Sequence, residues 1–245
     1  MKYMLLAYSP EQAWTHEEWT ACTIASGKIC QELQSHGQFI AAAPLHPVAT
    51  AATVRVRQGA PLITAGPFAE TTEQLGGFFL IDVADLDAAI AIAARLPSAR
   101  KGTVEVRPVL RLDGLPADRF SDQPAGSGTR YMLLCYDDAQ VWNELGAAAL
   151  HAAQAEAVAL VQQVDARGQY ISASPLHPIT TATSVRIRQG QRLVSDGPFA
   201  ETREVLGGFY LIQARDLNDA LAVAAKHPGA KIGTVEIRRL VDLPT

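Results

Sequence analysis

The chain alternates between short runs of closely spaced apolar residues and longer stretches in which apolar residues recur every three or four positions. Valine and arginine alternate over residues 54–57 (VRVR), a period-two pattern that predicts a strand with one apolar face. Residues 17–35 instead show helical spacing, with Ile29 and Leu33 on one stripe and Gly37 where a helix-ending glycine belongs. We expect the following elements in the first half: strand Lys2–Tyr8, helix Glu17–Ser35, strands Phe39–Ala43, Thr53–Gln58, Leu62–Ala65 and Gly77–Val83, helix Leu86–Arg95 and strand Thr103–Val109.

The second half of the chain repeats the first, segment by segment. YMLLAY at Tyr3–Tyr8 returns as YMLLCY at Tyr131–Tyr136, and GPFAET at Gly66–Thr71 returns at Gly197–Thr202. A period of this length is too long for a solenoid repeat, so the chain contains two fused copies of one domain. We divide the sequence into a first copy at 1–110, a linker rich in proline, glycine and polar residues at 111–129, and a second copy at 130–245.

The order of elements predicts the fold. A β-α-β…β-α-β order is typical of a ferredoxin-like α+β sandwich, in which both helices cover one face of a sheet. The runs at Tyr3–Tyr8 and Phe78–Val83 are apolar at nearly every position, so both faces of these strands should be buried. The bare face of each sheet then needs a partner, and the other copy supplies one. We therefore expect two tandem ferredoxin-like domains that form an intramolecular pseudo-dimeric α/β barrel with a cleft between the copies.

One segment carries a family resemblance. SDGPFAETREVLGGFYLI at Ser195–Ile212 resembles the signature of the YCII-related superfamily, specifically its DGPF-domain branch, and YMLLCY and GTVEIR at Gly233–Arg238 fit the same family. The resemblance covers both copies and implies a ferredoxin-like dimeric α/β barrel. Most members of the family are uncharacterised. Some are similar to dehydrochlorinase-type enzymes that use a His–Asp pair, and many are linked genetically to extracytoplasmic-function sigma factors.

The two copies differ at the motif aspartate. The second copy keeps it as Asp196 (DGPFAE), whereas the first has Ala65 (AGPFAE), so only the second site is competent if this carboxylate performs chemistry. An aspartate before Gly-Pro also suits the first position of a β-turn, because its side chain can accept hydrogen bonds from backbone N–H groups further along. Both interpretations of Asp196 remain open. Smaller relatives also place a histidine on the first helix, and His151 is the nearest match in the second copy.

His177 is the candidate proton-transfer residue. It lies between Leu176 and Pro178 just after a predicted strand, and histidine exchanges protons near neutral pH. A His177–Asp196 pair is the sharpest acid/base hypothesis that the sequence offers. The alternative is a histidine that only completes a polar loop.

Four further residues are candidates for substrate binding. Arg186 and Arg188 alternate with aliphatic residues, so both should point away from the helices, either into the cleft, where they could bind an anion, or into solvent as edge-strand charges. Tyr136 ends the first strand of the second copy and is a candidate to line the cleft. Glu201 follows the Gly-Pro-Phe turn and would either enter the cleft or cap backbone groups.

Composition excludes several classes of function. A net charge of −4 without a basic run argues against nucleic-acid binding, and no apolar stretch is long enough to span a membrane. The three cysteines have no metal-ligand spacing, which predicts reduced residues of a cytoplasmic protein and no metal site. Nucleotide-binding and metalloprotease motifs are absent from the sequence, so we expect no cofactor.

Two functional hypotheses follow. The first is a cofactor-independent acid/base enzyme that acts on a small organic molecule between the copies, of which a lyase or dehydrochlorinase-like reaction is the form implied by the resemblance. The second is a non-catalytic ligand-binding or regulatory module that partners a sigma factor. Further self-association into a homo-oligomer is compatible with both.

Overall fold

The computed structural model describes residues 1–68, 71–120, 128–199 and 202–242. The strands of the first copy are β1 Lys2–Ser9, β2 Phe39–Pro44, β3 Ala52–Arg57, β4 Ala60–Ala65, β5 Gln74–Asp82 and β6 Thr103–Pro108. Those of the second copy are β7 Thr129–Asp137, β8 Tyr170–Pro175, β9 Thr183–Arg188, β10 Gln191–Asp196, β11 Val205–Ala214 and β12 Thr234–Arg239. The helices are α1 His16–Ser35, α2 Leu86–Arg95, α3 Ser98–Lys101, α4 Ala139–Leu145, α5 Ala147–Ala166 and α6 Leu217–Ala224, joined by 3-10 turns at Glu11–Ala13, Val48–Thr50, Ile179–Thr181 and Pro228–Lys231.

Local sequence signals place the helix ends. Thr15 caps α1, accepting a hydrogen bond from the backbone N–H of Glu18, whose carboxylate in turn accepts from the N–H of Thr15. Asp85 is the N-cap residue of α2, and Asp216 is the equivalent N-cap residue of α6 in the second copy. Both are expected there because each directly precedes an apolar run. The expected helices are therefore confirmed. The second copy adds α4, which occupies the place of a 3-10 turn in the first.

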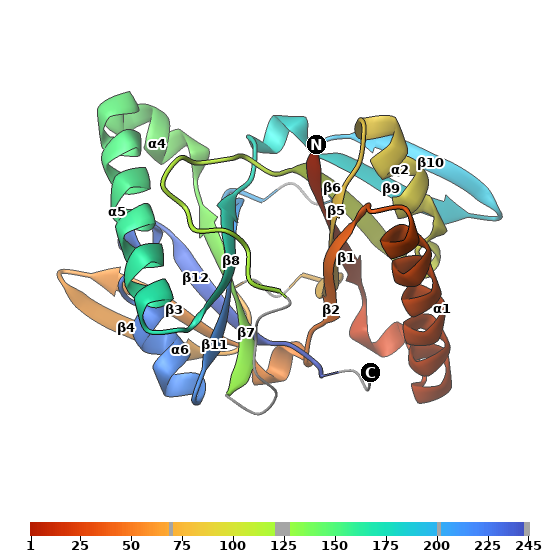
Figure 1. Cartoon of the computed structure of the whole chain (residues 1–245), viewed down its shortest axis with the longest axis horizontal. Coiled ribbons are helices and arrows are strands. Elements are labelled where there is room, and N and C mark those ends of the chain that lie inside the picture. Colours follow the sequence, from red (N-terminus) through yellow and green to blue (C-terminus); the bar gives the residue numbers. More distant parts are fainter. Residues whose placement is uncertain (69–70, 121–127, 200–201, 243–245) are drawn as a thin grey trace.

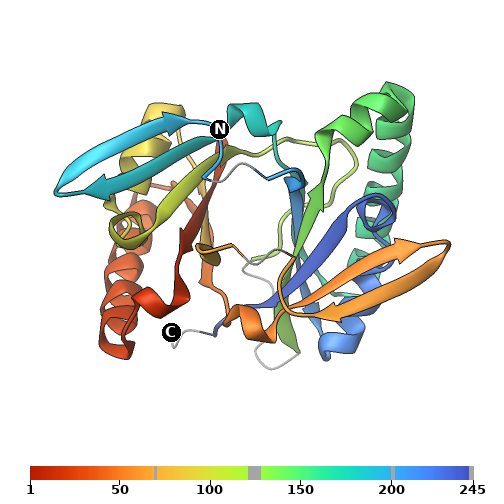
Figure 2. The same ribbon diagram turned by 180° about the vertical axis from the view of Figure 1, so that it is seen from behind.

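The strands form two six-stranded antiparallel sheets that exchange hairpins between the copies. The sheet orders are β10-β9-β6-β1-β5-β2 and β4-β3-β12-β7-β11-β8, so hairpin β9–β10 of the second copy extends the sheet of the first, and β3–β4 extends the sheet of the second. Each exchanged hairpin joins the sheet through a short ladder, such as Val54 opposite Val235 and Val104 opposite Val185. Figure 2 shows the two hairpins projecting at opposite ends of the molecule.

The two sheets close into a barrel. Isolated bridges pair Leu45 with Leu240 and Val109 with Leu176, which join the free edges of β2 and β8 to the ends of β12 and β6. The helices lie outside the barrel, with α1 and α2 on one side and α4, α5 and α6 on the other (Figure 1). The predicted fold is confirmed: two tandem ferredoxin-like units form an α+β pseudo-dimeric barrel within one chain.

The barrel interior is packed with apolar side chains from both copies. Met4, Leu6, Phe78, Met132 and Phe209 belong to a single buried cluster inside the barrel. Two further clusters fill the space between each sheet and its helices. Because the central strands contribute to both kinds of cluster, they are buried on both faces, as expected. A cavity of about 60 Å³ lies inside near Phe78 and Phe120, too small for a substrate and its reacting groups.

The linker follows the second copy closely. Leu115 packs against the cluster beneath α5, and the Arg119 guanidinium lies 2.8 Å from the Asp165 carboxylate on that helix. Ser172 donates a hydrogen bond of 2.7 Å to Asp118, and Tyr170 donates one of 3.3 Å to the carbonyl of Pro116. The linker therefore covers α5 and the edge strand β8, which makes the surroundings of the second copy different from those of the first.

Candidate functional site

A cavity of about 510 Å³ lies beside the second copy, between α5, the end of its sheet and the linker. Its walls are mainly apolar, and the contributing residues include Leu110, Leu112, Leu115, Leu150, Ala153, Ala157, Val158, Val161, Leu176, Leu206, Phe209 and Tyr210. Its polar and titratable lining comprises Arg107, Cys135, Asp137, Trp142, Asn143, Gln154, Ser174, His177, Thr180 and His227. A mainly apolar cavity with a few convergent polar groups is the usual form of a small-molecule site.

Asp137 ends β7 and is held by a tryptophan. Its Oδ2 accepts a hydrogen bond of 2.8 Å from the indole Nε1–H of Trp142 on α4. Gly207 leaves room for the carboxylate, since a Cβ at that position would lie 3.0 Å from Oδ1. Burial raises the pKa of Asp137, and the nearby Glu204 and Asp138 carboxylates raise it further, whereas the hydrogen bond from Trp142 lowers it. Asp137 is therefore a positioned carboxyl group that gives up its proton less readily than an exposed one.

His227 forms the other polar wall and is neutral. Its Nδ1 accepts a hydrogen bond of 3.0 Å from the backbone N–H of Gly229, so Nε2 carries the ring proton, 3.6 Å from the sulfur of Cys135. Burial lowers the pKa of His227 to about 4 and raises that of the Cys135 thiol. The pair is thus an imidazole beside a thiol, not the thiolate–imidazolium pair of a cysteine nucleophile.

These groups are specific to the second copy. Cys135, Asp137 and His227 stand where the first copy has Ala7, Ser9 and Leu96. The tryptophan is shared, because Trp14 donates its indole N–H to the Ser9 hydroxyl at 2.9 Å as Trp142 does to Asp137. Two differences on β7 and a third that lies far along the chain, at His227, therefore converge on the lining of one cavity. Asp137 and His227 belong to no recognised motif and were not predicted, although both residues differ between the two copies.

The structure places His177 and Asp196 in different surroundings. His177 follows β8 and borders the cavity; its backbone N–H donates to the Pro108 carbonyl at 2.9 Å, and its own carbonyl accepts from Arg107 at 2.8 Å. Asp196 ends the exposed strand β10 of the exchanged hairpin and is not part of the cavity lining. Within the described part of the chain, no hydrogen bond or ion pair joins the two side chains. The proposed His177–Asp196 pair therefore stays a prediction without a direct contact to support it.

The two predicted arginines are bound to the protein itself. Arg186 donates to the Thr103 hydroxyl at 2.8 Å and to the Phe199 carbonyl at 3.3 Å. Arg188 donates to the carbonyls of Ala99 at 2.9 Å and Gly102 at 3.0 Å, at the end of α3. Both arginines therefore fasten the exchanged hairpin to the first copy, and their role in anion recognition stays a prediction.

Tyr136 and Glu201 complete the set of predicted binding residues. The Tyr136 ring stacks on Phe68 of the first copy, with ring centroids 4.4 Å apart, and burial raises the pKa of its hydroxyl. Glu201 lies outside the described residues. Tyr136 therefore contributes to the contact between the two copies. Its role in binding a ligand stays a prediction.

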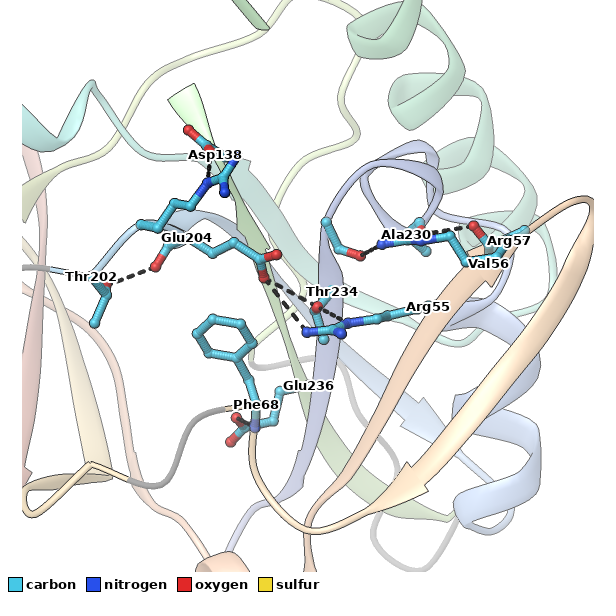
Figure 3. Close-up of polar contacts among 12 residues, drawn as sticks. Arg55, Val56, Arg57, Phe68, Asp138, Thr202, Glu204, Ala230, Thr234 and Glu236 are labelled. Atoms are coloured by element: carbon cyan, nitrogen blue, oxygen red, sulfur yellow. Dashed lines mark hydrogen bonds and ion pairs between the residues drawn. The ribbon is translucent and has the colours of Figure 1, made fainter. Parts of the chain in front are cut away.

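Two buried ion pairs, one in each copy, bind the loops that follow the exchanged hairpins. Glu236 accepts a hydrogen bond of 2.8 Å from the backbone N–H of Phe68 and forms an ion pair with Arg238 at 3.3 Å. In the related position of the first copy, Glu105 accepts a hydrogen bond of 3.1 Å from the backbone N–H of Phe199. Figure 3 shows Glu236 beside Phe68, with Arg55, Thr234 and Glu204 joined nearby. The buried glutamates of the last strand in each copy thus hold the motif loops in place.

Replacing Asp196 by alanine tests its structural role. Because the side chain is exposed and has no interaction partner in the described ranges, we expect the free energy of unfolding to change by less than about 0.5 kcal/mol. Urea denaturation of the two proteins measures the difference. A loss of more than about 1 kcal/mol would show that the carboxylate stabilises the turn, as an Asp-Gly-Pro sequence allows.

Fold and site define the chain as a duplicated α+β barrel protein with a large cavity beside its second copy. Residues 1–113 and 129–244 each match the YCII-related domain, so the chain belongs to the YCII-related family and carries its domain twice. An uncharacterized protein of Rhizobium meliloti (strain 1021) is 39% identical over 114 residues, which cover 44% of this chain and 92% of the relative. The crystal structure of a protein described as "Putative Chlorite dismutase" is similar over 98% of this chain and 94% of that one, with 11% identity and a TM-score of 0.46.

The described residues offer neither a metal-binding cluster nor a membrane-spanning helix. No group of three or more His, Cys, Asp or Glu side chains is arranged to hold a metal ion in the described ranges. No helix among the same residues is both long and apolar enough to cross a membrane.

Proposed function

We propose that the protein binds a small, mainly apolar organic molecule in the cavity beside its second copy and transforms it by acid/base chemistry without a cofactor. The observation that carries this proposal is the 510 Å³ cavity, whose apolar walls enclose a carboxyl group with a raised pKa and two histidines. Perturbed titratable groups that converge in a cavity are typical of catalytic sites.

The cavity contains groups suited to moving a proton. His177 borders it from the loop after β8, and Asp137 faces it from the end of β7. Elimination is the most specific reaction that we propose, on the basis of the family resemblance. In that reaction a base takes a proton from one carbon, the C–H electrons form the double bond, and the leaving group departs from the neighbouring carbon with its bonding pair.

A cavity-filling variant tests the proposal. Ala153 lines the cavity from α5, so Ala153→Phe should occupy part of the space without burying a charge. A thermal-shift screen with a metabolite library should yield compounds that stabilise the wild type, by about 2.7 kcal/mol at one hundred times the dissociation constant. These compounds should not stabilise Ala153→Phe. The matched control is Cys22→Phe at the related position on α1, which does not border the cavity and should leave binding intact.

The outcomes separate the functional classes. Turnover of a bound compound supports the enzyme. Binding without turnover by any hit supports the ligand-binding module. If no compound stabilises the wild type, the cavity is not a small-molecule site and the proposal is rejected.

A second candidate function, binding of a protein partner, rests on the exchanged hairpins. Leu62 and Ile63 on β4 are 55% and 57% exposed, and Leu193 and Val194 on β10 are 49% and 45% exposed. Exposed apolar residues on an edge strand favour pairing with another chain. This candidate gains support if the ligand screen yields no binder and the wild type self-associates or retains a co-purified sigma factor. Leu62→Lys, which places a charge on the exposed edge strand, should then do neither.

A further inference from the structure

We propose that Asp137 is the ligand-recognition group of the cavity, and that it accepts a hydrogen bond from a hydroxyl group on a neutral, mainly apolar ligand. This inference rests on the proposed function, namely that the cavity binds a small organic molecule. It adds the chemical class of the ligand and the residue that selects it.

The geometry leaves one carboxylate oxygen for a ligand. Oδ2 of Asp137 is taken by the indole N–H of Trp142, whereas Oδ1 accepts no hydrogen bond from any described residue. Oδ1 lies at the cavity wall beside Gly207, where the missing side chain keeps the space in front of it open. Trp142 thus acts as a positioning residue that fixes the direction in which Oδ1 points.

The surrounding charges select against an anion. Arg107 is the cation in the lining, and its two terminal nitrogens are already bonded to Glu105 at 3.2 Å and to the His177 carbonyl at 2.8 Å. His227 is neutral, and the carboxylates of Glu204 and Asp138 raise the pKa of Asp137. A carboxylate ligand at Oδ1 would therefore meet the negative charge of Asp137 itself, whereas a hydroxyl group can donate to Oδ1.

Divergence between the copies points to the same residue. The first copy keeps the tryptophan and places a hydroxyl, Ser9, where the second has Asp137. A serine that already accepts an indole N–H satisfies the structural need for a partner to the tryptophan. The carboxylate is therefore present in the copy that borders this cavity and replaced by serine in the other.

Three matched probes test this selection: phenol, toluene and benzoate. They share a six-membered ring, which fits because even a cavity of about 150 Å³ holds benzene. NMR titrations of the wild type should give a dissociation constant for phenol about tenfold lower than for toluene, the expected effect of one hydrogen bond to a charged acceptor. Benzoate should bind more weakly than either. In Asp137→Ser, which installs the residue of the first copy, the preference for phenol should fall below about twofold.

Control variants keep the two proposals distinguishable. Trp142→Phe should reduce the preference for phenol because the carboxylate loses its anchor, and Trp14→Phe, the same change in the first copy, should not. If phenol and toluene bind the wild type equally, or if Asp137→Ser keeps the preference, the inference is overturned while the proposed function stands. If none of the probes binds and the metabolite screen is also empty, the proposed function itself has failed. A cooperative thermal transition of each apo variant shows that it is folded.

Discussion

Replacement of Glu236 by alanine is expected to destabilise the protein by about 3–5 kcal/mol, the usual result of removing one partner of a buried ion pair. Arg238 is 1% exposed and pairs with Glu236 at 3.3 Å, so the variant would leave a buried guanidinium without its counter-charge. The backbone N–H of Phe68 would lose its acceptor as well. Because Phe68 follows the exchanged hairpin and stacks on Tyr136, the loss should loosen the contact between the copies (Figure 3).

A double variant separates the charge from the packing. Glu236→Ala combined with Arg238→Met removes both charges and keeps an apolar side chain of similar length, so it should recover much of the lost stability. Urea denaturation of wild type, single and double variants gives the three free energies of unfolding. A single variant within about 1 kcal/mol of the wild type would show that this ion pair does not hold the hairpin loop.

Acid should destabilise the protein between pH 6.5 and about 4 through His227. The ordinary pKa of histidine, 6.5, applies to the unfolded chain, and burial lowers the pKa of His227 to about 4 in the folded protein. A depressed histidine pKa contributes stability when the ring is neutral, above the unfolded value. That stability is lost as the pH falls toward the folded value. A shift of about 2.5 units corresponds to a loss on the order of 3 kcal/mol.

His227→Leu, which installs the residue found at Leu96 in the first copy, should remove this dependence. The measurement is the free energy of unfolding as a function of pH, and the informative quantity is its slope between pH 4 and 6.5 rather than its value at pH 7. The matched control is the exposed His151 on α5, whose replacement by leucine should leave the slope unchanged. Equal slopes in the wild type and in His227→Leu would contradict a neutral, buried His227.

Hydrophobic patterning was sufficient to predict the barrel but not the exchange of hairpins. Strand and helix positions follow from local spacing, and the burial of both faces of β1 and β5 required a second sheet. The exchange could not be predicted because the copies have the same pattern. Val54 could pair in the same register with Val104 of its own copy or, as observed, with Val235 of the other copy. The alternation of side chains along the strand is the same in both cases and cannot distinguish them.

The candidate site was predicted in part. His177 was expected near a functional site and borders the cavity, whereas Asp196, chosen for its motif, lies on an exposed strand. Asp137 and His227 belong to no motif, and they become neighbours of one cavity only through the packing of α5 and the linker. No local pattern in the sequence encodes that packing. Comparison of the two copies, which share a fold but differ at the cavity lining, is what reveals such residues.

The most direct test of a ligand site at Asp137 is the indole N–H signal of Trp142 in a proton–nitrogen NMR spectrum. The chain has three tryptophans, so three indole signals can be assigned with single Trp→Phe variants. Addition of phenol should shift the Trp142 signal, because its N–H is bonded to the recognising carboxylate, and should leave those of Trp14 and Trp19 unchanged. A shift at Trp14 or Trp19 alone, or no shift at Trp142 at saturating phenol, would contradict the account.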